Sequence, residues 1–233
     1  MYRLTNIHQA MLYAIFYKEW IKTRLYYIIA GILMIGFACY AGLYLNRLDD
    51  LAGARKLWEY FLMKNDSQIT ILEFVPLIVA IGGAIVQFAP EMNRKCLKLT
   101  LHLPYNALKT VGAMMFYGVA VLLLCSVVSF LVLHFSMTGI LPDEIRTKIL
   151  QTSIPWFLAG ICGYLLTVWV VLQPVWKKRI LQIILSVFVI KMFFITVTPG
   201  AYTPTILIFA ALSVMTAVLS IISLNDFKEG KQD

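Results

Sequence analysis

Long apolar stretches separated by short polar segments follow one another along the whole chain. Six of them approach or exceed the ~20 residues that a helix needs to cross a bilayer. We expect these spans at residues 26–45, 71–89, 111–135, 154–173, 180–197 and 205–224. The third stretch is longer than one crossing requires, which indicates a tilt or an extension beyond the bilayer. The pattern therefore predicts an all-α integral membrane protein with six transmembrane helices.

The segment before the first span, residues 6–24, has the spacing of an amphipathic helix. Aromatic rings favour the headgroup layer and lysines favour anionic lipid, so we expect an interfacial (elbow) helix that lies along the membrane. Its membrane-facing side carries Tyr13, Phe16, Tyr17 and Trp20. Its polar side carries Lys18, Glu19, Lys22, Thr23 and His8. A cytoplasmic extension of the first span is the alternative interpretation.

The distribution of charge predicts how the spans are oriented. With the N-terminus inside, the inner segments hold thirteen Lys and Arg and the outer segments six, while Lys191 lies within a span. Acids cancel the outer cations, so the net charge of +8 lies on the inner side. This is the positive-inside bias of integral membrane proteins. We therefore expect the inner membrane of a prokaryote and cytoplasmic termini, with an elbow helix at 1–25, a transmembrane domain at 26–224 and a cytoplasmic tail at 225–233.

Composition supports this class and excludes others. Hydrophobic residues make up 61% of the chain and charged residues 14%, against about 45–50% and about 25% in soluble proteins. The positive-inside bias already accounts for the pI of 9.3, so we expect no nucleic-acid partner. The four cysteines form no CxxC pair, and no disulfide is predicted.

Motifs for catalysis and metal binding are missing from the sequence. There is no GxxxxGK[ST] phosphate loop, so the chain cannot bind ATP in the Walker manner by itself. HExxH and GxSxG are missing as well, and the three histidines stand far apart. We therefore expect no catalytic residue, no metal site and no cofactor bound by this chain.

Two charged residues lie inside the predicted spans, Glu73 in the second and Lys191 in the fifth. At ~1.5 Å per residue their depths can match. A charge at the centre of a span costs roughly 2.5–3.5 kcal/mol on insertion scales, which favours an intramembrane charge pair or contact with a polar cavity. Alternatively, both side chains snorkel to the outer surface. The sequence leaves both interpretations open.

The loop between the second and third spans carries the most distinctive polar pattern. Residues 88–106 read FAPEMNRKCLKLTLHLPYN, with an acid, two adjacent cations, alternating leucines and a closing proline. The pattern E-x-x-R-K-x-L-x-L-x-L-x-L-P, the N-terminal segment FYKEWIKTR and the six spans together resemble the permease subunit of type-2 ABC transporters. In that family this loop packs on the ATPase subunit as a coupling helix.

The resemblance implies an ATPase-coupling interface in the loop 90–109, formed by Glu91, Arg94, Lys95, Leu97, Leu99, Leu101 and Pro104. The second inner loop would add a minor contact through Trp176, Lys177 and Lys178. This sequence departs from the family in its loop between the fifth and sixth spans, which is short for the family's re-entrant helices, and at two places in the motif. Lys95–Cys96 stands where the family often has Gly-Thr after the cation, and Asn106 stands where a cation often follows the proline.

The resemblance also implies the function. The chain would form half of a translocation pathway, more in keeping with export than with uptake, while ATP and Mg²⁺ bind to a separate ATPase subunit. A second permease copy or a similar chain would complete the pathway, and membrane lipid would surround it. Two other classes stay open: a non-transporting membrane assembly factor or sensor, and a six-helix substrate-binding component of an uptake system. Apolar spans suit many cargoes, so the sequence selects no substrate.

Overall fold

Helices make up the protein in its computed structural model, and the part of the chain that it describes contains no strand. The described residues are 2–64, 70–93, 107–138, 142–196 and 202–228. The long helices are α1 (Tyr2–Lys64), α3 (Val75–Asn93), α5 (Ala107–Ser136), α6 (Asp143–Val171), α7 (Trp176–Met192) and α8 (Ile206–Lys228). Two short helices accompany them, α2 (Thr70–Glu73) and the 3₁₀ helix η1 (Thr203–Thr205).

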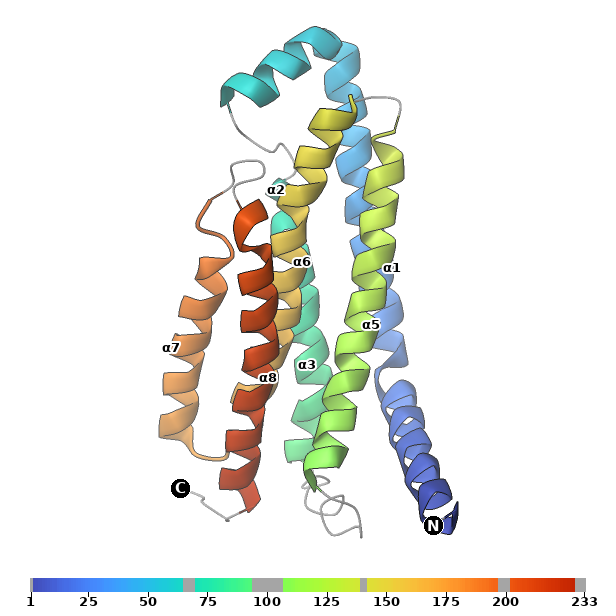
Figure 1. Ribbon diagram of the computed structural model, residues 1–233, viewed down its shortest axis with the longest axis vertical. Helices are drawn as coiled ribbons and strands as arrows, with labels where there is room; N and C mark the ends of the chain where they lie inside the picture. Colours follow the sequence, from blue (N-terminus) through green and yellow to red (C-terminus); the bar gives the residue numbers. More distant parts are fainter. Residues whose placement is uncertain (1, 65–69, 94–106, 139–141, 197–201, 229–233) are drawn as a thin grey trace.

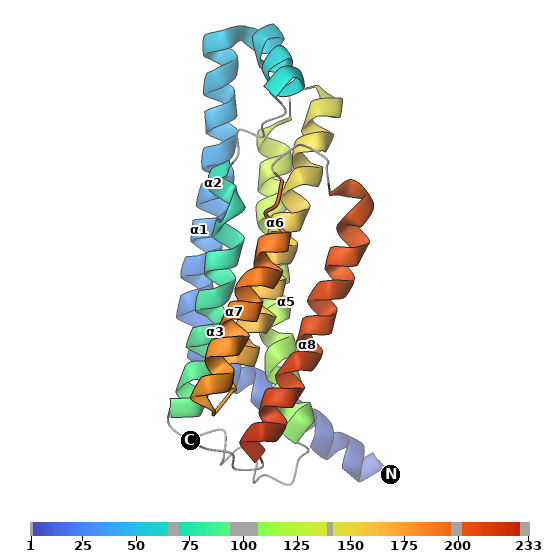
Figure 2. The ribbon, with the colours of Figure 1, turned by 90° about the vertical axis from the view of Figure 1, so that its left-hand side faces the viewer.

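The long helices lie side by side and alternate in direction (Figures 1 and 2). As a result, the start of α1 and the end of α8 lie at the same end of the bundle, which we call the lower end after its place in Figure 1. The last turn of α3 and the first turns of α5 and α7 lie at this end too. At the opposite end, α1 turns over the top of the bundle.

Five of the described helices are long and apolar enough to cross a membrane: the 11–47 part of α1, α3, and most of α5, α6 and α8. The expectation of an all-helical chain with several apolar spans is therefore confirmed. Helix α7 has 17 residues and ends at Met192, before the predicted end of the fifth span at residue 197.

The predicted elbow helix, the first span and the outer residues up to Lys64 belong to one continuous helix of 63 residues, α1. No proline or glycine lies between Tyr2 and Ala30, so nothing in the sequence interrupts the backbone hydrogen bonds there. Figure 2 shows the N-terminal part of α1 running obliquely across the lower end before the helix turns upward.

The predicted second span is interrupted at Phe74, between α2 and α3. Pro76, two residues after Phe74, has no backbone N–H to continue the hydrogen bonds of α2. The helical pattern of backbone hydrogen bonds resumes at Ile78, whose N–H donates to the Phe74 carbonyl at 3.0 Å. Glu73 therefore precedes the continuous apolar helix instead of lying inside it.

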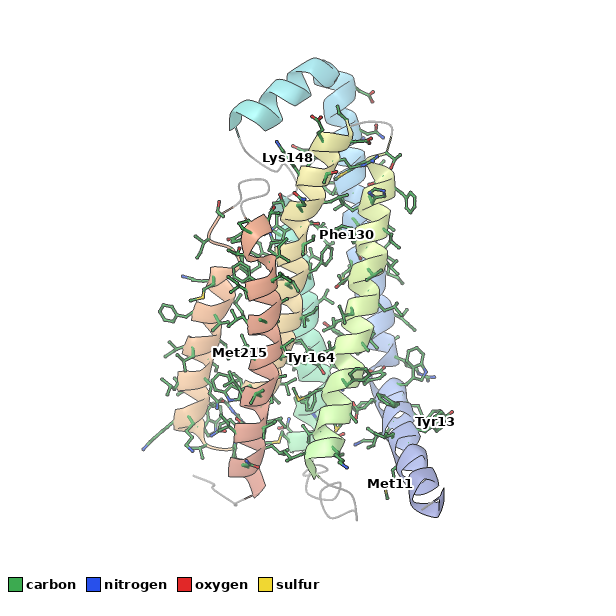
Figure 3. All side chains as sticks on the ribbon, viewed as in Figure 1. Met11, Tyr13, Phe130, Lys148, Tyr164 and Met215 are labelled. Atoms are coloured by element: carbon green, nitrogen blue, oxygen red, sulfur yellow. The ribbon has the colours of Figure 1, made fainter. Side chains whose placement is uncertain are left out.

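Helix α6 occupies the centre of the bundle and packs against α3, α5, α7 and α8. Small residues let α3 come close, since a Cβ on Gly160 would lie 3.0 Å from the Pro76 carbonyl oxygen. Tyr164 of α6 lies in the interior, while Met215 of α8 lies on the outer surface (Figure 3). Large apolar side chains cover the outer faces of α5, α7 and α8, as expected for surfaces that face lipid.

Candidate functional site

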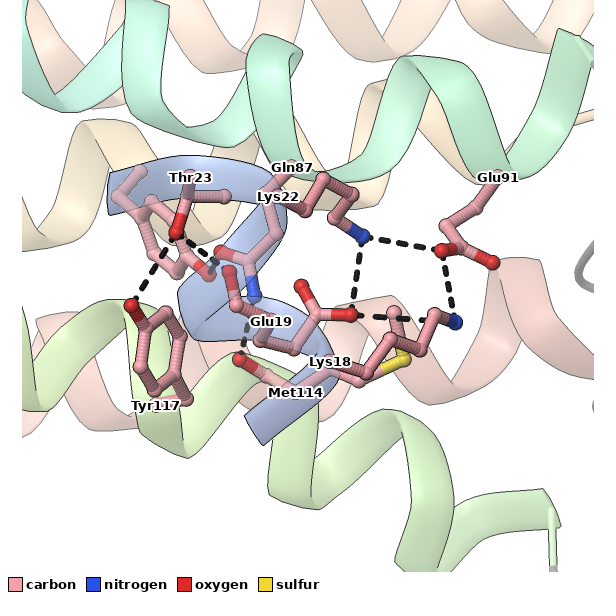
Figure 4. A network of polar contacts seen from close by, with 9 residues as sticks. Lys18, Glu19, Lys22, Thr23, Gln87, Glu91, Met114 and Tyr117 are labelled. Carbon is pink, nitrogen blue, oxygen red and sulfur yellow. Dashed lines mark hydrogen bonds and ion pairs between the residues drawn. The ribbon is translucent and has the colours of Figure 1, made fainter. Parts of the chain in front are cut away.

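Four charged side chains meet at the lower end of the bundle, where α1 passes the last turn of α3 (Figure 4). Lys18 Nζ lies 2.8 Å and Lys22 Nζ lies 2.9 Å from the same carboxylate oxygen of Glu91. Lys22 Nζ also lies 2.9 Å from Glu19 Oε1. Two cations therefore face two carboxylates, and we call these residues the charge cluster.

The carboxylates of this charge cluster are buried, and the lysines reach them from its edge. The Glu19 side chain is fully buried and that of Glu91 is 4% exposed, whereas that of Lys18 is 43% exposed. Each carboxylate keeps its second oxygen without a hydrogen-bond partner in the described part of the chain. Buried charges that lose their partners are strongly destabilising. The charge cluster therefore fixes the position of α1 relative to the end of α3.

A second contact ties the same part of α1 to α5. The Thr23 hydroxyl donates to the Glu19 carbonyl at 2.8 Å and lies 3.1 Å from the Tyr117 hydroxyl. The ring of Phe16 packs against Phe116 and Tyr117. The N-terminal part of α1 is thus held on two sides, by charge on α3 and by hydrogen bonding and packing on α5.

A buried amide continues this polar region toward the centre of the bundle. Gln87, one helical turn before Glu91, accepts a hydrogen bond from the Tyr164 hydroxyl at 2.6 Å. Its amide nitrogen donates to the Met114 carbonyl at 2.8 Å. Gly118 makes room for this junction, because a Cβ there would collide with the Tyr164 hydroxyl. Helices α3, α5 and α6 are joined at this single point.

The expected polar side of the N-terminal helix is oriented differently from the prediction. Glu19 and Thr23 turn into the bundle, where α3 and α5 supply their partners. The aromatic side chains Tyr13, Tyr17 and Trp20 are exposed, and Tyr13 projects away from the bundle (Figure 3). Phe16, by contrast, is half-buried against α5.

Most of the predicted coupling loop lies outside the described residues, namely Arg94, Lys95, Leu97, Leu99, Leu101 and Pro104. Glu91 alone of that set is described, and it is buried. The residues of the predicted minor contact, Trp176, Lys177 and Lys178, are exposed at the start of α7 and therefore accessible at the lower end. The guanidinium of Arg179 lies 5.0 Å from the centre of the Trp176 ring.

Glu73 and Lys191 lie on segments that are close together, since the rings of Phe74 and Phe194 stack with their centroids 5.0 Å apart. Glu73 is buried at the end of α2, and Lys191 is exposed in the last turn of α7. No ion pair joins the two among the contacts of the described residues. The described residues also contain no group of three or more His, Cys, Asp and Glu side chains that could hold a metal ion.

Sequence reasoning missed the partners of Glu91 and the Gln87 junction. One signal was available, because Gln87 and Glu91 are four residues apart in an apolar run and therefore share a helix face. Two polar groups on one face of such a helix indicate partners on a neighbouring helix. The identity of those partners depends on how α1 and α6 pack against α3.

Comparisons of the chain with protein-family models, with curated proteins and with solved structures find no match.

Proposed function

We propose that this chain is the transmembrane permease subunit of an ATP-driven ABC transporter, with ATP hydrolysis on a separate ATPase subunit. One observation carries the proposal: Glu91, the first residue of the loop motif, forms ion pairs with Lys18 and Lys22 of α1. Residues 94–106, which carry the rest of the motif, follow α3 directly. A force applied by a partner to this segment would act on the last turn of α3.

The charge cluster gives such a force a route into the bundle. Movement of Glu91 displaces the lysines that it pairs with, and these belong to the N-terminal part of α1. That part of α1 contacts α5 through Thr23 and Tyr117. Coupling between distant sites needs packed elements of this kind with defined contacts. Three helices would therefore respond together to a partner that docks at the lower end.

The arrangement of the helices supports six crossings with cytoplasmic termini. The long helices alternate in direction (Figure 1), and at ~1.5 Å per residue α7 spans about 26 Å of a ~30 Å hydrocarbon core. Lys109, Lys177, Lys178 and Arg179 gather at the lower end, as the positive-inside rule requires of a cytoplasmic side. A second permease copy or a similar chain would complete the pathway, and the family resemblance favours export.

The test uses the full tagged chain, purified in mild detergent from its native membrane. We expect a nucleotide-binding subunit to travel with it and to hydrolyse ATP with vanadate sensitivity. Arg94→Ala should release this subunit, since Arg94 belongs to the docking motif. Glu91→Gln and the milder Lys18→Gln should retain it while altering the ATPase rate, because the Glu91 carboxylate is buried and contacts α1.

Asp143→Asn provides the matched control, because its carboxylate is 86% exposed and lies on the opposite end of the bundle. This change should leave both binding and hydrolysis as in the wild type. An intact chain without an ATPase partner would refute the proposal and favour an assembly factor or sensor. Loss of the subunit in Glu91→Gln at temperatures where this variant stays folded would show that Glu91 is needed for docking, against the role assigned to it here.

A further inference from the structure

An apolar groove of about 410 Å³ opens between α5 and α8, with α6 as its floor. Its walls are almost entirely hydrocarbon, and they include Val111, Met115, Val119, Leu165, Ala217 and Ile221. Helices α5 and α8 lie on the same side of the bundle (Figure 1). The groove therefore opens on the outer surface, where a membrane protein meets the bilayer.

The groove has the length of one leaflet. Its lining runs over residues 108–119 of α5 and 213–224 of α8. These two stretches lie next to each other because the start of α5 and the end of α8 share the lower end. Twelve helical residues extend over roughly 17 Å, and one leaflet contributes about half of a ~30 Å hydrocarbon core. The groove is thus aligned with the acyl chains of the leaflet at the lower end.

The volume of the groove is closer to that of an acyl chain than to that of a helix. A helix is about 10 Å in diameter, so a 17 Å length of it fills on the order of 1,300 Å³, well above the groove's 410 Å³. An extended hydrocarbon chain is only about 4–5 Å across, given carbon contact distances near 4 Å, and fills on the order of 300 Å³ over the same length. A single acyl chain can therefore enter the groove, whereas a transmembrane helix of a second copy can lie only across its rim.

Two polar features specify the head of the ligand. Ser220 lines the groove and is buried, and its hydroxyl has no hydrogen-bond partner in the described part of the chain. It lies five residues before Asn225, the end of the apolar part of α8, so its depth is about 7–8 Å below that boundary. Lys109 is exposed and follows the lining residue Leu108 at the start of α5, at the lower end of the bundle. The hydroxyl lies near the depth of ester carbonyls, and the ammonium lies near that of headgroups.

We propose that the groove between α5 and α8 binds an anionic phospholipid from the leaflet at the lower end. One acyl chain lies in the groove, the Ser220 hydroxyl donates to the ester carbonyl, and Lys109 faces the phosphate. This binding is argued separately from the transport function proposed above, because the groove contains no residue of the charge cluster and only Leu108 and Lys109, at its lower end, belong to the coupling loop 90–109.

Gly112 allows a direct test, since it lines the groove and a Cβ built on it meets no atom within 4 Å. Gly112→Leu should fill the groove without a clash inside the protein. Gly36 of α1 is the matched control, because its Cβ also meets nothing within 4 Å and it lies outside the groove lining. Gly36→Leu therefore makes the same chemical change away from the site.

The full chain is purified, delipidated and reconstituted in nanodiscs of dioleoyl phosphatidylcholine with a fraction of dioleoyl phosphatidylglycerol, and retained lipid is counted by native mass spectrometry. Wild type and Gly36→Leu should retain one phosphatidylglycerol. Gly112→Leu should retain about tenfold less or lower, because the leucine occupies the space of the chain. Lys109→Gln should reduce the preference for phosphatidylglycerol over phosphatidylcholine by about fivefold, the value of one cation near an anionic surface. Ser220→Ala should weaken the retention of both lipids alike.

Equal lipid retention by wild type and Gly112→Leu would overturn the proposal. The proposal would also be overturned if Gly112→Leu left lipid retention unchanged and removed a contact between two copies of the chain. Cysteine crosslinking in the same nanodiscs detects such a contact. An unchanged lipid preference in Lys109→Gln would refute the assignment of the headgroup.

Discussion

The substitution Glu91→Gln tests the charge cluster most directly. The amide keeps the size of the side chain and can still accept a hydrogen bond, so only the charge is lost. Lys18 and Lys22 then face a single carboxylate, that of Glu19, from which they lie 4.0 Å and 2.9 Å away. One positive charge remains without compensation at a site where Glu91 was 4% exposed.

The expected loss of stability follows from this burial. Breaking a buried ion pair by removing one partner costs about 3–5 kcal/mol. The smallest cost in that range applies here, because Lys18 is 43% exposed and can turn toward water. We therefore expect the free energy of unfolding to fall by about 3 kcal/mol. For a chain of 233 residues, this corresponds to a decrease in Tm of about 6–12 °C.

Thermal unfolding of the purified chain in mild detergent measures this decrease. Asp143→Asn is the matched control, because Asp143 also forms an ion pair, 2.7 Å from Arg146, yet its side chain is 86% exposed. An exposed ion pair contributes about 0–1 kcal/mol, so Tm should change by less than about 3 °C. If both variants unfold at the same temperature, burial does not distinguish the two ion pairs, and the structural role given to the charge cluster is wrong.

Two further changes test other parts of the structure. Gly118→Ala should lower the free energy of unfolding by about 1–3 kcal/mol, because the new Cβ collides with the Tyr164 hydroxyl; Tyr164→Phe in the same chain should recover part of this loss, and Gly36→Ala should cause none. A tolerated Gly118→Ala would contradict the close packing of α5 on α6. Since no ion pair joins Glu73 and Lys191 among the described residues, reversing both charges should not restore the stability lost in either single reversal. A rescue of stability in the double variant would show that the two residues pair.

The positions of the apolar helices could be predicted from the sequence, and the reason is local. In a bilayer each helix satisfies its own backbone hydrogen bonds, so the length and composition of a stretch decide whether it can span. All but the first residue of the predicted sixth span, 205–224, lies within α8, and the third span lies within α5. Pro76 ends α2 for an equally local reason, the missing N–H, although its effect on Glu73 became clear only from the observed helix ends.

The candidate site depends on the tertiary structure. A helical wheel separates the two sides of residues 11–24, but it does not say which side faces the bundle. That choice depends on Glu91, 72 residues after Glu19, because its carboxylate supplies the negative charge beside which Lys18 and Lys22 pack. The same holds for Tyr164, whose hydroxyl meets Gln87 only because Gly118 leaves space for it.

The groove shows the same division between sequence and structure. The sequence shows that α5 and α8 are apolar along their length, which suits either lipid or another helix. Only their packing on α6 leaves a space between them, and only this packing buries Ser220 without a partner in the described part of the chain. Backbone hydrogen bonding and hydrophobicity determine where helices form, whereas side chains from distant segments determine which of their faces become buried.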